Sequence, residues 1–161
     1  SVSDTNGVYF IPAFQGLGTP YWNMDVRAGI TGLTRAAGKA HIVRAALESI
    51  AYRTKDVVDV MEKESGIKLT DIQVDGGACR NDFLMQFQSD ILDSRIIRPD
   101  NIETTAMGAA YLAGLAVGFW SDINEIKNIL REDVIFKPAM DQEQRASLYS
   151  GWQKAIGSCL I

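Results

Sequence analysis

The segment from His41 to Ser65 constrains the fold more than any other part of the chain. Its apolar residues recur at spacings of three and four, which predicts an amphipathic helix of about six turns. The predicted inward positions are Val43, Ala46, Leu47, Ile50, Val57, Val58 and Met61. The charged positions between them are Arg44, Glu48, Arg53, Lys55, Asp56, Asp59 and Glu62. Gly66 supplies the usual C-terminal stop, so the rest of the chain is expected to pack around this helix.

Shorter segments lie on either side of the long helix, and strand-like patterns alternate with helix-like patterns along them. Predicted strands cover 7–14, 28–34, 71–77 and 94–99, and further predicted helices cover 81–92, 104–118 and 141–159. The inward residues are Leu84, Phe87 and Ile91 in the helix 81–92, and Leu148, Tyr149, Trp152 and Ile156 in the last helix. Strands that alternate with helices predict an α/β layer with some parallel pairing.

The helix 104–118 is unusual because small residues crowd one of its faces. Gly108, Ala109, Ala113 and Gly114 leave that face nearly flat, so another backbone could approach closely. The alternative is tight helix packing alone. The apolar run from Met107 to Trp120 is too short to span a bilayer and is expected to be a buried helix. Thr104 or Thr105 is the predicted N-cap.

Composition excludes several classes of function. The chain has 161 residues, 47% of them apolar and 22% charged, which fits one globular domain. A net charge of −4 without clustered Lys and Arg argues against a nucleic-acid partner. Two distant cysteines, Cys79 and Cys159, form neither a disulfide framework nor a metal motif and suggest a reducing cytoplasm. No signal peptide and no membrane-spanning segment are expected.

The titratable residues suggest no catalytic or metal site. His41 is the only histidine, which excludes a multi-histidine metal site, and its place at a helix start favours a solvated or capping role. Asp56 and Asp59 share a helix with Glu62 and Glu64, and these carboxylates are expected to lie on a solvated surface. The prediction is therefore that this chain contains no catalytic residue and no metal ligand.

The stretch "VDGGACRND", residues 74–82, is the candidate binding site. Gly76 and Gly77 follow a predicted strand, at the end of an α/β sheet where ligands bind. Glycine lets a ligand touch the backbone without meeting a Cβ. The next helix offers free N–H groups, and Asn81 carries both a donor and an acceptor. The alternative is that the two glycines form an ordinary turn and bind no ligand. The Gly-Lys-Ser/Thr of a phosphate-binding loop is absent, and "GLG" at 16–18 lacks the helix of a dinucleotide fingerprint.

Four blocks of the sequence resemble a known family in the same order. They are "VYFIPAFQGLGTPYW", "AGITGLTRAAGKAHIVRAALESIAYRT", "VDGGACRNDFLMQFQSDIL" and "TTAMGAAYLAGLAVGFW". Together they are similar to the C-terminal half of the glycerol kinases, a group of FGGY carbohydrate kinases in the actin, Hsp70 and hexokinase superfamily. The resemblance runs from about Gly7 to Trp152. The block "PAFQGLGTPYW" favours glycerol kinases over xylulose or gluconate kinases.

The resemblance implies a fold and a ligand. The fold would be part of an actin-like ATPase, or ribonuclease H-like, domain: an α/β mixed sheet with flanking helices, lacking its first strands. Residues 1–161 would be a partial C-terminal nucleotide-binding domain. Its Asp-Gly-Gly corner would close over the adenosine part of ATP or ADP, with Gly76, Gly77 and Ala78 lining the pocket and Asn81 on the adenine side. The helix at 104–118 would pack against a partner domain near a hinge.

The same resemblance implies what this chain does not carry. The base that accepts the glycerol proton, the glycerol pocket and the first phosphate-binding hairpins would lie upstream of Ser1. Phosphoryl transfer needs positioning, Mg²⁺ and that base together, so the chain alone is expected to be inactive. A bare sheet edge would invite self-association, and a homo-oligomer is expected. The alternatives are the same half of another sugar or polyol kinase, and a non-catalytic nucleotide-binding scaffold.

The sequence departs from the family pattern in two places. Residues 22–28 read Trp-Asn-Met-Asp-Val-Arg-Ala where family members usually have Trp-Asp-Pro followed by Ala-Arg-Gly. No substrate-side role is assigned to that loop. Cys79 and Arg80 lie in a variable part of the corner and are given no role either.

Overall fold

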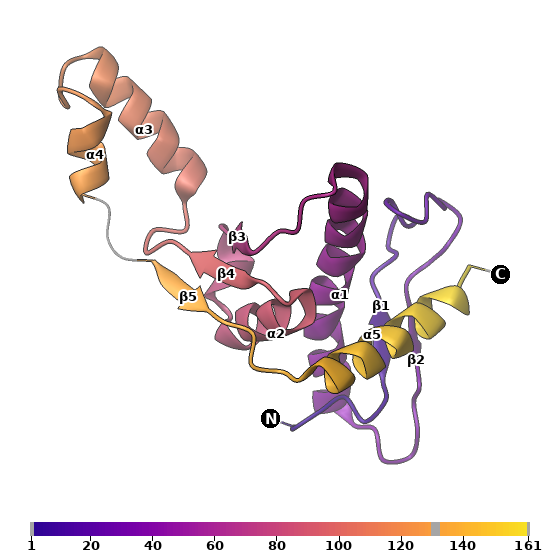
Figure 1. Cartoon of the computed structure of the whole chain (residues 1–161). Coiled ribbons are helices and arrows are strands. Elements are labelled where there is room, and N and C mark those ends of the chain that lie inside the picture. Colours follow the sequence, from indigo (N-terminus) through magenta and orange to yellow (C-terminus); the bar gives the residue numbers. More distant parts are fainter. Residues whose placement is uncertain (1, 130–132, 161) are drawn as a thin grey trace.

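The computed structural model describes residues 2–129 and 133–160 as a mixed α/β chain (Figure 1). The strands are β1 (Tyr9–Ile11), β2 (Gly29–Thr31), β3 (Asp71–Gln73), β4 (Arg95–Arg98) and β5 (Val134–Phe136). The helices are α1 (Lys39–Ser65), the 3₁₀ turn η1 (Gly77–Arg80), α2 (Asp82–Leu92), α3 (Thr104–Ala116), α4 (Ile123–Ile129) and α5 (Gln142–Gly157). The predicted elements are all present: α1 begins two residues before its predicted start, the others have shorter bounds, and η1, α4 and β5 are additions. No helix in the described ranges is both long and apolar enough to cross a bilayer.

Local signals explain where the helices begin and end. Gly66 closes α1 in the left-handed region, at φ 69°, and its N–H donates to the carbonyl of Glu62. His41 does cap the start of this helix, because its Nδ1 accepts a hydrogen bond from the N–H of Gly38 at 3.0 Å. Asp141 caps α5 by accepting from the N–H of Gln144. The expected threonine cap of α3 is wrong: Glu103 holds that position without a side-chain bond.

The core lies where α1, α2 and α5 meet, with β1 beside them. Tyr52 of α1 stacks on Trp152 of α5 with ring centroids 5.2 Å apart, and its edge meets Phe87 of α2 at 5.5 Å. The predicted inward stripe of α2 is confirmed, since Leu84, Phe87 and Ile91 are all buried. In α5, Trp152 and Ile156 are fully enclosed, while Leu148 and Tyr149 are partly buried. These aromatic side chains supply much of the apolar area buried on folding.

Helix α1 is turned the opposite way from the prediction. Four of the predicted inward residues are between 37% and 53% exposed; they are Val43, Ile50, Val57 and Met61, and we call them the outer stripe of α1. Of the seven predicted positions only Val58 is buried. The buried face carries Ala45, Glu48, Ser49, Ala51, Tyr52, Asp56 and Val58. The helix thus puts its more polar face inward, and an apolar stripe faces solvent.

The expected solvated position of Asp56 is therefore also wrong. Its carboxylate accepts hydrogen bonds from the Tyr149 hydroxyl at 2.8 Å and from Trp152 Nε1 at 3.1 Å. It also pairs with Arg53 at 2.9 Å. Burial, reinforced by the Asp56 carboxylate, raises the pKa of Tyr149 far above its usual value, so the phenol stays protonated and donates. Asp59 behaves as predicted, as a half-exposed partner of Lys55.

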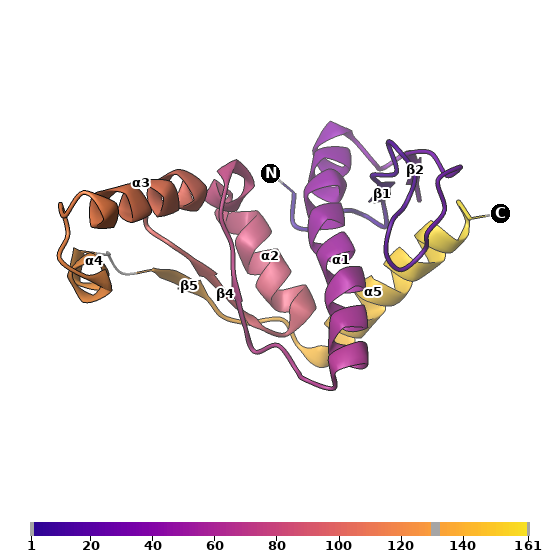
Figure 2. The same cartoon turned by 90° about the horizontal axis from the view of Figure 1, so that it is seen from above.

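The larger sheet is mixed, as expected, with the order β3-β4-β5. Strand β3 pairs with β4 in parallel, and β4 pairs with β5 antiparallel. Within the described residues β3 has β4 as its one neighbour, so its other edge is bare. Strands β1 and β2 form a separate antiparallel pair against α1. Helices α1 and α2 lie side by side on one flank of the sheet (Figure 2).

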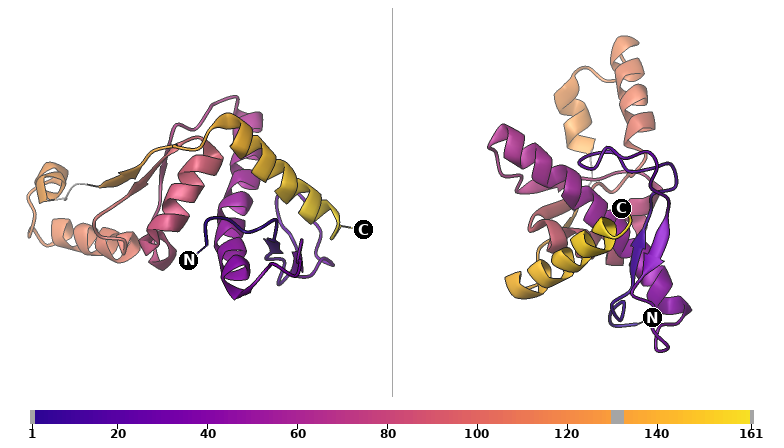
Figure 3. Two further views of the ribbon diagram at one scale, coloured as in Figure 1. Left: turned by 90° about the horizontal axis from the view of Figure 1, so that it is seen from below. Right: turned by 90° about the vertical axis from the view of Figure 1, so that its right-hand side faces the viewer.

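Helices α3 and α4 project away from α1 and α5, as the further views also show (Figure 3). The expectation of a buried helix at Met107–Trp120 is wrong, because Leu112, Val117 and Phe119 are 71%, 81% and 74% exposed. Gly114 is the buried residue of α3, and a Cβ there would lie 2.2 Å from the Trp120 ring. Glycine at position 114 therefore allows α3 to pack closely against the Trp120 ring.

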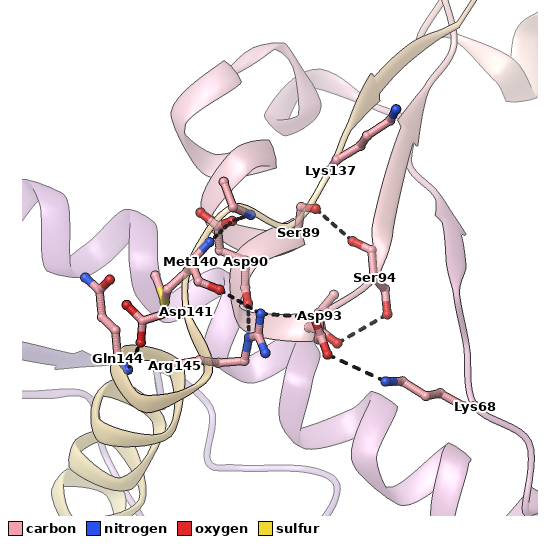
Figure 4. Close-up of polar contacts among 12 residues, drawn as sticks. Lys68, Ser89, Asp90, Asp93, Ser94, Lys137, Met140, Asp141, Gln144 and Arg145 are labelled. Carbon is pink, nitrogen blue, oxygen red and sulfur yellow. Dashed lines mark hydrogen bonds and ion pairs between the residues drawn. The ribbon is translucent and has the colours of Figure 1, made fainter.

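A polar cluster fastens the start of α5 to the end of α2 (Figure 4). Arg145 of α5 donates to the Asp90 carbonyl at 2.5 Å and to the Met140 carbonyl at 3.0 Å, and its other contact is an ion pair with Asp93. The Asp90 carboxylate in turn accepts from the Ala139 N–H at 2.7 Å. These bonds hold the segment between β5 and α5 against α2.

Candidate functional site

The Gly-Gly corner lies at the carboxyl end of β3, as predicted. The Val74 N–H donates to the Ile97 carbonyl at 3.0 Å, which carries the parallel pairing one residue beyond β3. The Gly76 N–H then donates to the Ile102 carbonyl at 2.9 Å. Gly76 has φ 79°, in the region that favours glycine. The chain turns there and enters η1 at Gly77.

Both glycines face open space. A Cβ built on Gly76 or on Gly77 would meet no atom within 4 Å. Ala78, the next residue, is exposed, and Cys79 turns inward, with its thiol donating to the Gly76 carbonyl at 2.9 Å. The positive φ explains glycine at position 76. At Gly77 no contact inside the chain requires glycine, so the bare backbone there is available to a ligand.

Asn81 has two roles in the geometry of the corner. Its Oδ1 accepts from the Leu84 N–H at 3.1 Å, so it is the N-cap of α2. Its amide Nδ2 makes no hydrogen bond to any described residue, which leaves two N–H donors for another group. The acceptor half of the side chain is thus used by the helix, and the donor half is open.

The charge at the start of α2 favours an uncharged ligand. The cap accounts for the N–H of Leu84, and the Met85 N–H donates to the Asn81 carbonyl. Asp82 stands in the first turn, where a carboxylate interacts favourably with the positive end of the helix dipole. A phosphate placed at the same end would face that carboxylate. A neutral heterocycle or sugar hydroxyl would not pay this electrostatic cost.

Two side-chain contacts fasten the corner from outside. Arg98, at the end of β4, donates from Nη1 to the Cys79 carbonyl and to the Asp82 carboxylate, both at 2.7 Å. On the other side, the Thr104 hydroxyl donates to the Asp75 carboxylate, which joins the end of β3 to the start of α3. The corner is therefore tied to strand β4 through Arg98 and to helix α3 through Thr104.

The predicted residues come together, but not inside a cavity. Gly76, Gly77, Ala78 and Asn81 are consecutive or nearly so, and none of them lines the large groove of about 1400 Å³ nearby. That groove runs between the sheet and α3 and is lined by residues such as Asp75, Arg98 and Tyr111. In the described ranges no group of three or more His, Cys, Asp or Glu side chains is placed to hold a metal ion.

Sequence reasoning missed the residues that fasten the corner. Arg98 belongs to a predicted strand and Thr104 to a predicted helix. The apolar spacing that predicts such elements does not show which side chain reaches across to a turn. Arg98 directly precedes Pro99, so its place at a strand end was visible in the sequence. Its target, a backbone carbonyl of residue 79, was not visible.

The comparisons with known proteins agree with one another. Residues 1–117 match the family model described as the FGGY family of carbohydrate kinases, C-terminal domain. The chain is 61% identical over 155 residues to the glycerol kinase of Treponema denticola, an alignment that covers 96% of this chain and 31% of that protein. It is 60% identical over 155 residues to the glycerol kinase of a Thermoanaerobacter species, with the same coverage. The chain thus spans about a third of the length of the curated relatives it matches.

Solved structures give the same picture. Plasmodium falciparum glycerol kinase, solved with ADP, superimposes with a TM-score of 0.88 at 41% identity, over 99% of this chain and 32% of that one. Xylulose kinase from Lactobacillus acidophilus superimposes with a TM-score of 0.67 at 24% identity over 98% of this chain, which supports the fold alone.

Proposed function

The chain belongs to the FGGY family of carbohydrate kinases, and from this membership we propose that it is the C-terminal part of a glycerol kinase. Such an enzyme transfers the γ-phosphate of ATP to glycerol and gives glycerol 3-phosphate. The high identity to glycerol kinases along nearly the whole chain supports glycerol rather than another sugar or polyol as the acceptor. The match of a glycerol kinase solved with ADP supports ATP and ADP as the nucleotides.

The part of the reaction assigned to this chain is binding of the adenosine end of ATP. The observation that carries this proposal is the open space over Gly76 and Gly77 at a strand's carboxyl end. The two glycines let the flat base approach the backbone, and Ala78 adds a small apolar wall. The free Nδ2 of Asn81 donates to a ring nitrogen of the base. Asp82 keeps the phosphates away from the start of α2 and directs them outward.

The phosphate chemistry is assigned to other parts of the enzyme. Kinases of this kind use Mg²⁺ with ATP to neutralise charge on the transferred group. The described residues assemble no carboxylate cluster that fits such an ion, and none of them is given a metal-binding or proton-accepting role. The purified 161-residue chain is accordingly expected to show no glycerol phosphorylation.

The remaining two thirds of such an enzyme need a surface on which to pack. We assign the outer stripe of α1 and the bare edge of β3 to this contact. An unpaired strand edge offers N–H and C=O groups to a further strand, and the stripe offers exposed apolar side chains to another protein surface. The enzyme is further proposed to act in the cytoplasm as a homo-oligomer. Cys79 and Cys159 of this chain are unpaired, as expected in a reducing compartment.

Calorimetric titration of the chain with ATP tests the nucleotide site. Gly77→Val places a branched side chain in the open space and is expected to abolish detectable binding, and Asn81→Asp keeps the helix cap while removing the Nδ2 donors. Gly157→Val, on the exposed end of α5, is the matched control. Binding by both corner variants at the strength of the parent would show that the nucleotide binds elsewhere.

Co-expression with the first two thirds of the Treponema denticola enzyme tests the packing surface. We expect the two pieces to purify together and to recover glycerol phosphorylation. Ile50→Asp and Val57→Asp, on the outer stripe, are expected to prevent this, whereas Val134→Asp, equally exposed but on β5, is not. Recovery of activity by the two stripe variants would refute the assignment of this surface.

A further inference from the structure

We propose that Arg98 is a positioning residue for the nucleotide corner, which it shapes by holding the Cys79 carbonyl. This inference rests on the proposed adenosine site and goes beyond it, because Arg98 touches neither Gly76, Gly77 nor Asn81. It acts on the turn between them. The residue lies on β4, the neighbouring strand, so the shape of the corner is set from outside its own segment.

The contacts of Arg98 are those of a fixed side chain. Its Nη1 donates at 2.7 Å to the Cys79 carbonyl, in the middle of η1, and at 2.7 Å to Asp82. The guanidinium lies over the Phe136 ring, 5.1 Å from its centroid. The side chain is 16% exposed, against 49% for Arg95 on the same strand. The guanidinium is therefore held in place by Phe136 of β5 and by the turn, while the backbone of Arg98 belongs to β4.

The two hydrogen bonds of Arg98 differ in how strongly they hold the turn. Asp82 is 75% exposed, and an exposed ion pair contributes little. The Cys79 carbonyl belongs to a 3₁₀ turn of four residues. At its two ends the N–H groups of Cys79 and Asn81 donate to the carbonyls of Gly76 and Ala78, both at 3.2 Å. A charged donor to a carbonyl is stronger than these bonds, so Arg98 decides where the turn sits.

The position of the turn matters because Gly77 and Ala78 move with it. A 3₁₀ turn has poorer hydrogen-bond geometry than an α-helix and adjusts easily. Without Arg98 it is expected to sample several positions while α2 stays in place, since α2 has its own cap and a buried stripe. Binding of a rigid base must then order the turn, and that ordering lowers the affinity.

The test compares three variants of the chain: Arg98→Met, Arg98→Lys and Arg95→Met. Arg95 is the matched control because it lies on the same strand and pairs with Asp71, away from the corner. ATP affinity is measured by titration, and amide hydrogen exchange is followed at Cys79 and Asn81. Exchange in the interior of α2 reports whether the fold is intact.

We expect Arg98→Met to weaken ATP binding roughly 10-fold, the effect of losing one charge-assisted hydrogen bond. Exchange at Cys79 and Asn81 should accelerate by a similar factor while the interior of α2 is unchanged. Arg98→Lys keeps the charge but not the flat stack on Phe136, so it should fall between Arg98→Met and the parent. Arg95→Met should match the parent in both measurements.

Two results would overturn the inference. The first is unchanged exchange at Cys79 and Asn81 in Arg98→Met. The second is equal acceleration in the turn and throughout α2, which would make Arg98 a general stabilising residue. A parent chain that binds no ATP refutes the proposed function instead, and the exchange data still decide whether Arg98 holds the turn.

Discussion

Replacement of Asp56 by alanine is expected to be among the most destabilising single changes on α1. The carboxylate is enclosed, at 3% exposure, and accepts hydrogen bonds from Tyr149 and Trp152 while pairing with Arg53. Removing it leaves the indole N–H of Trp152, a residue with no exposed surface, without a partner. Breaking a buried ion pair by deleting one member costs about 3–5 kcal/mol.

That cost is a large share of the stability of a chain this size. A domain of 150–250 residues loses about 2–4 °C of Tm per kcal/mol, so Asp56→Ala should lower Tm by roughly 6–20 °C. Urea unfolding followed by tryptophan fluorescence measures the same loss as a lower midpoint with an unchanged slope. Asp56→Asn, which keeps an acceptor for Trp152, should lose less.

Asp59→Ala is the matched control for this prediction. Asp59 follows Asp56 on α1 by three residues, and its pair with Lys55 has a carboxylate that is 40% exposed. Exposed pairs contribute about 0–1 kcal/mol, so this variant should unfold close to the parent. Equal losses for Asp56→Ala and Asp59→Ala would refute the conclusion that burial and the three donors make Asp56 special.

Three further predictions concern pH, packing and association. Burial raises the pKa of Glu48, so the folded state binds its proton more tightly than the unfolded chain. The free energy of unfolding of the parent, relative to that of Glu48→Gln, should therefore fall as pH rises from about 4.5, the ordinary glutamate value. A difference that stays flat across pH would contradict this. Gly151→Ala would bring a Cβ within 2.0 Å of the Tyr9 hydroxyl and should lower the free energy of unfolding in urea by about 1–3 kcal/mol. The Cβ of Gly157→Ala, on the same helix, would meet no atom within 4 Å, so this variant should be neutral or stabilising. A larger loss for Gly157→Ala than for Gly151→Ala would count against the packing described. The bare edge of β3 should make the purified chain associate with rising concentration in light scattering, and Gln73→Lys on that edge should reduce the association; a monomer at every concentration would remove the support for an open edge.

Local patterns were sufficient to predict most of the elements. The glycine stop at Gly66 and the inward stripe of α2 depend on residues a few positions apart, and these were confirmed. Parallel pairing within an α/β layer also followed from the order of the elements, whereas the mixed sheet was implied by the resemblance. The family could be recognised from four blocks of residues, because their order and spacing are preserved along the chain.

The orientation of α1 shows where local patterns fail. Its apolar stripe correctly predicted a helix but not which side faces the core of this chain. The buried side is chosen by Tyr52, whose ring joins Trp152 and Phe87, and by Asp56, whose partners lie 93 and 96 residues along the chain. A periodic pattern contains no information about such distant partners.

For the candidate site, the sequence by itself determined the place and the chemical type of the corner. Two glycines after a strand and an asparagine before a helix require only local geometry, so Gly76, Gly77 and Asn81 could be named in advance, and Ala78 followed from the family resemblance. Only the tertiary structure decided how the corner is held, because the Arg98 side chain reaches it from another strand and Thr104 from another helix. The physical reason is that backbone conformation is set by near neighbours, whereas the partner of a side chain depends on how the strands and helices pack.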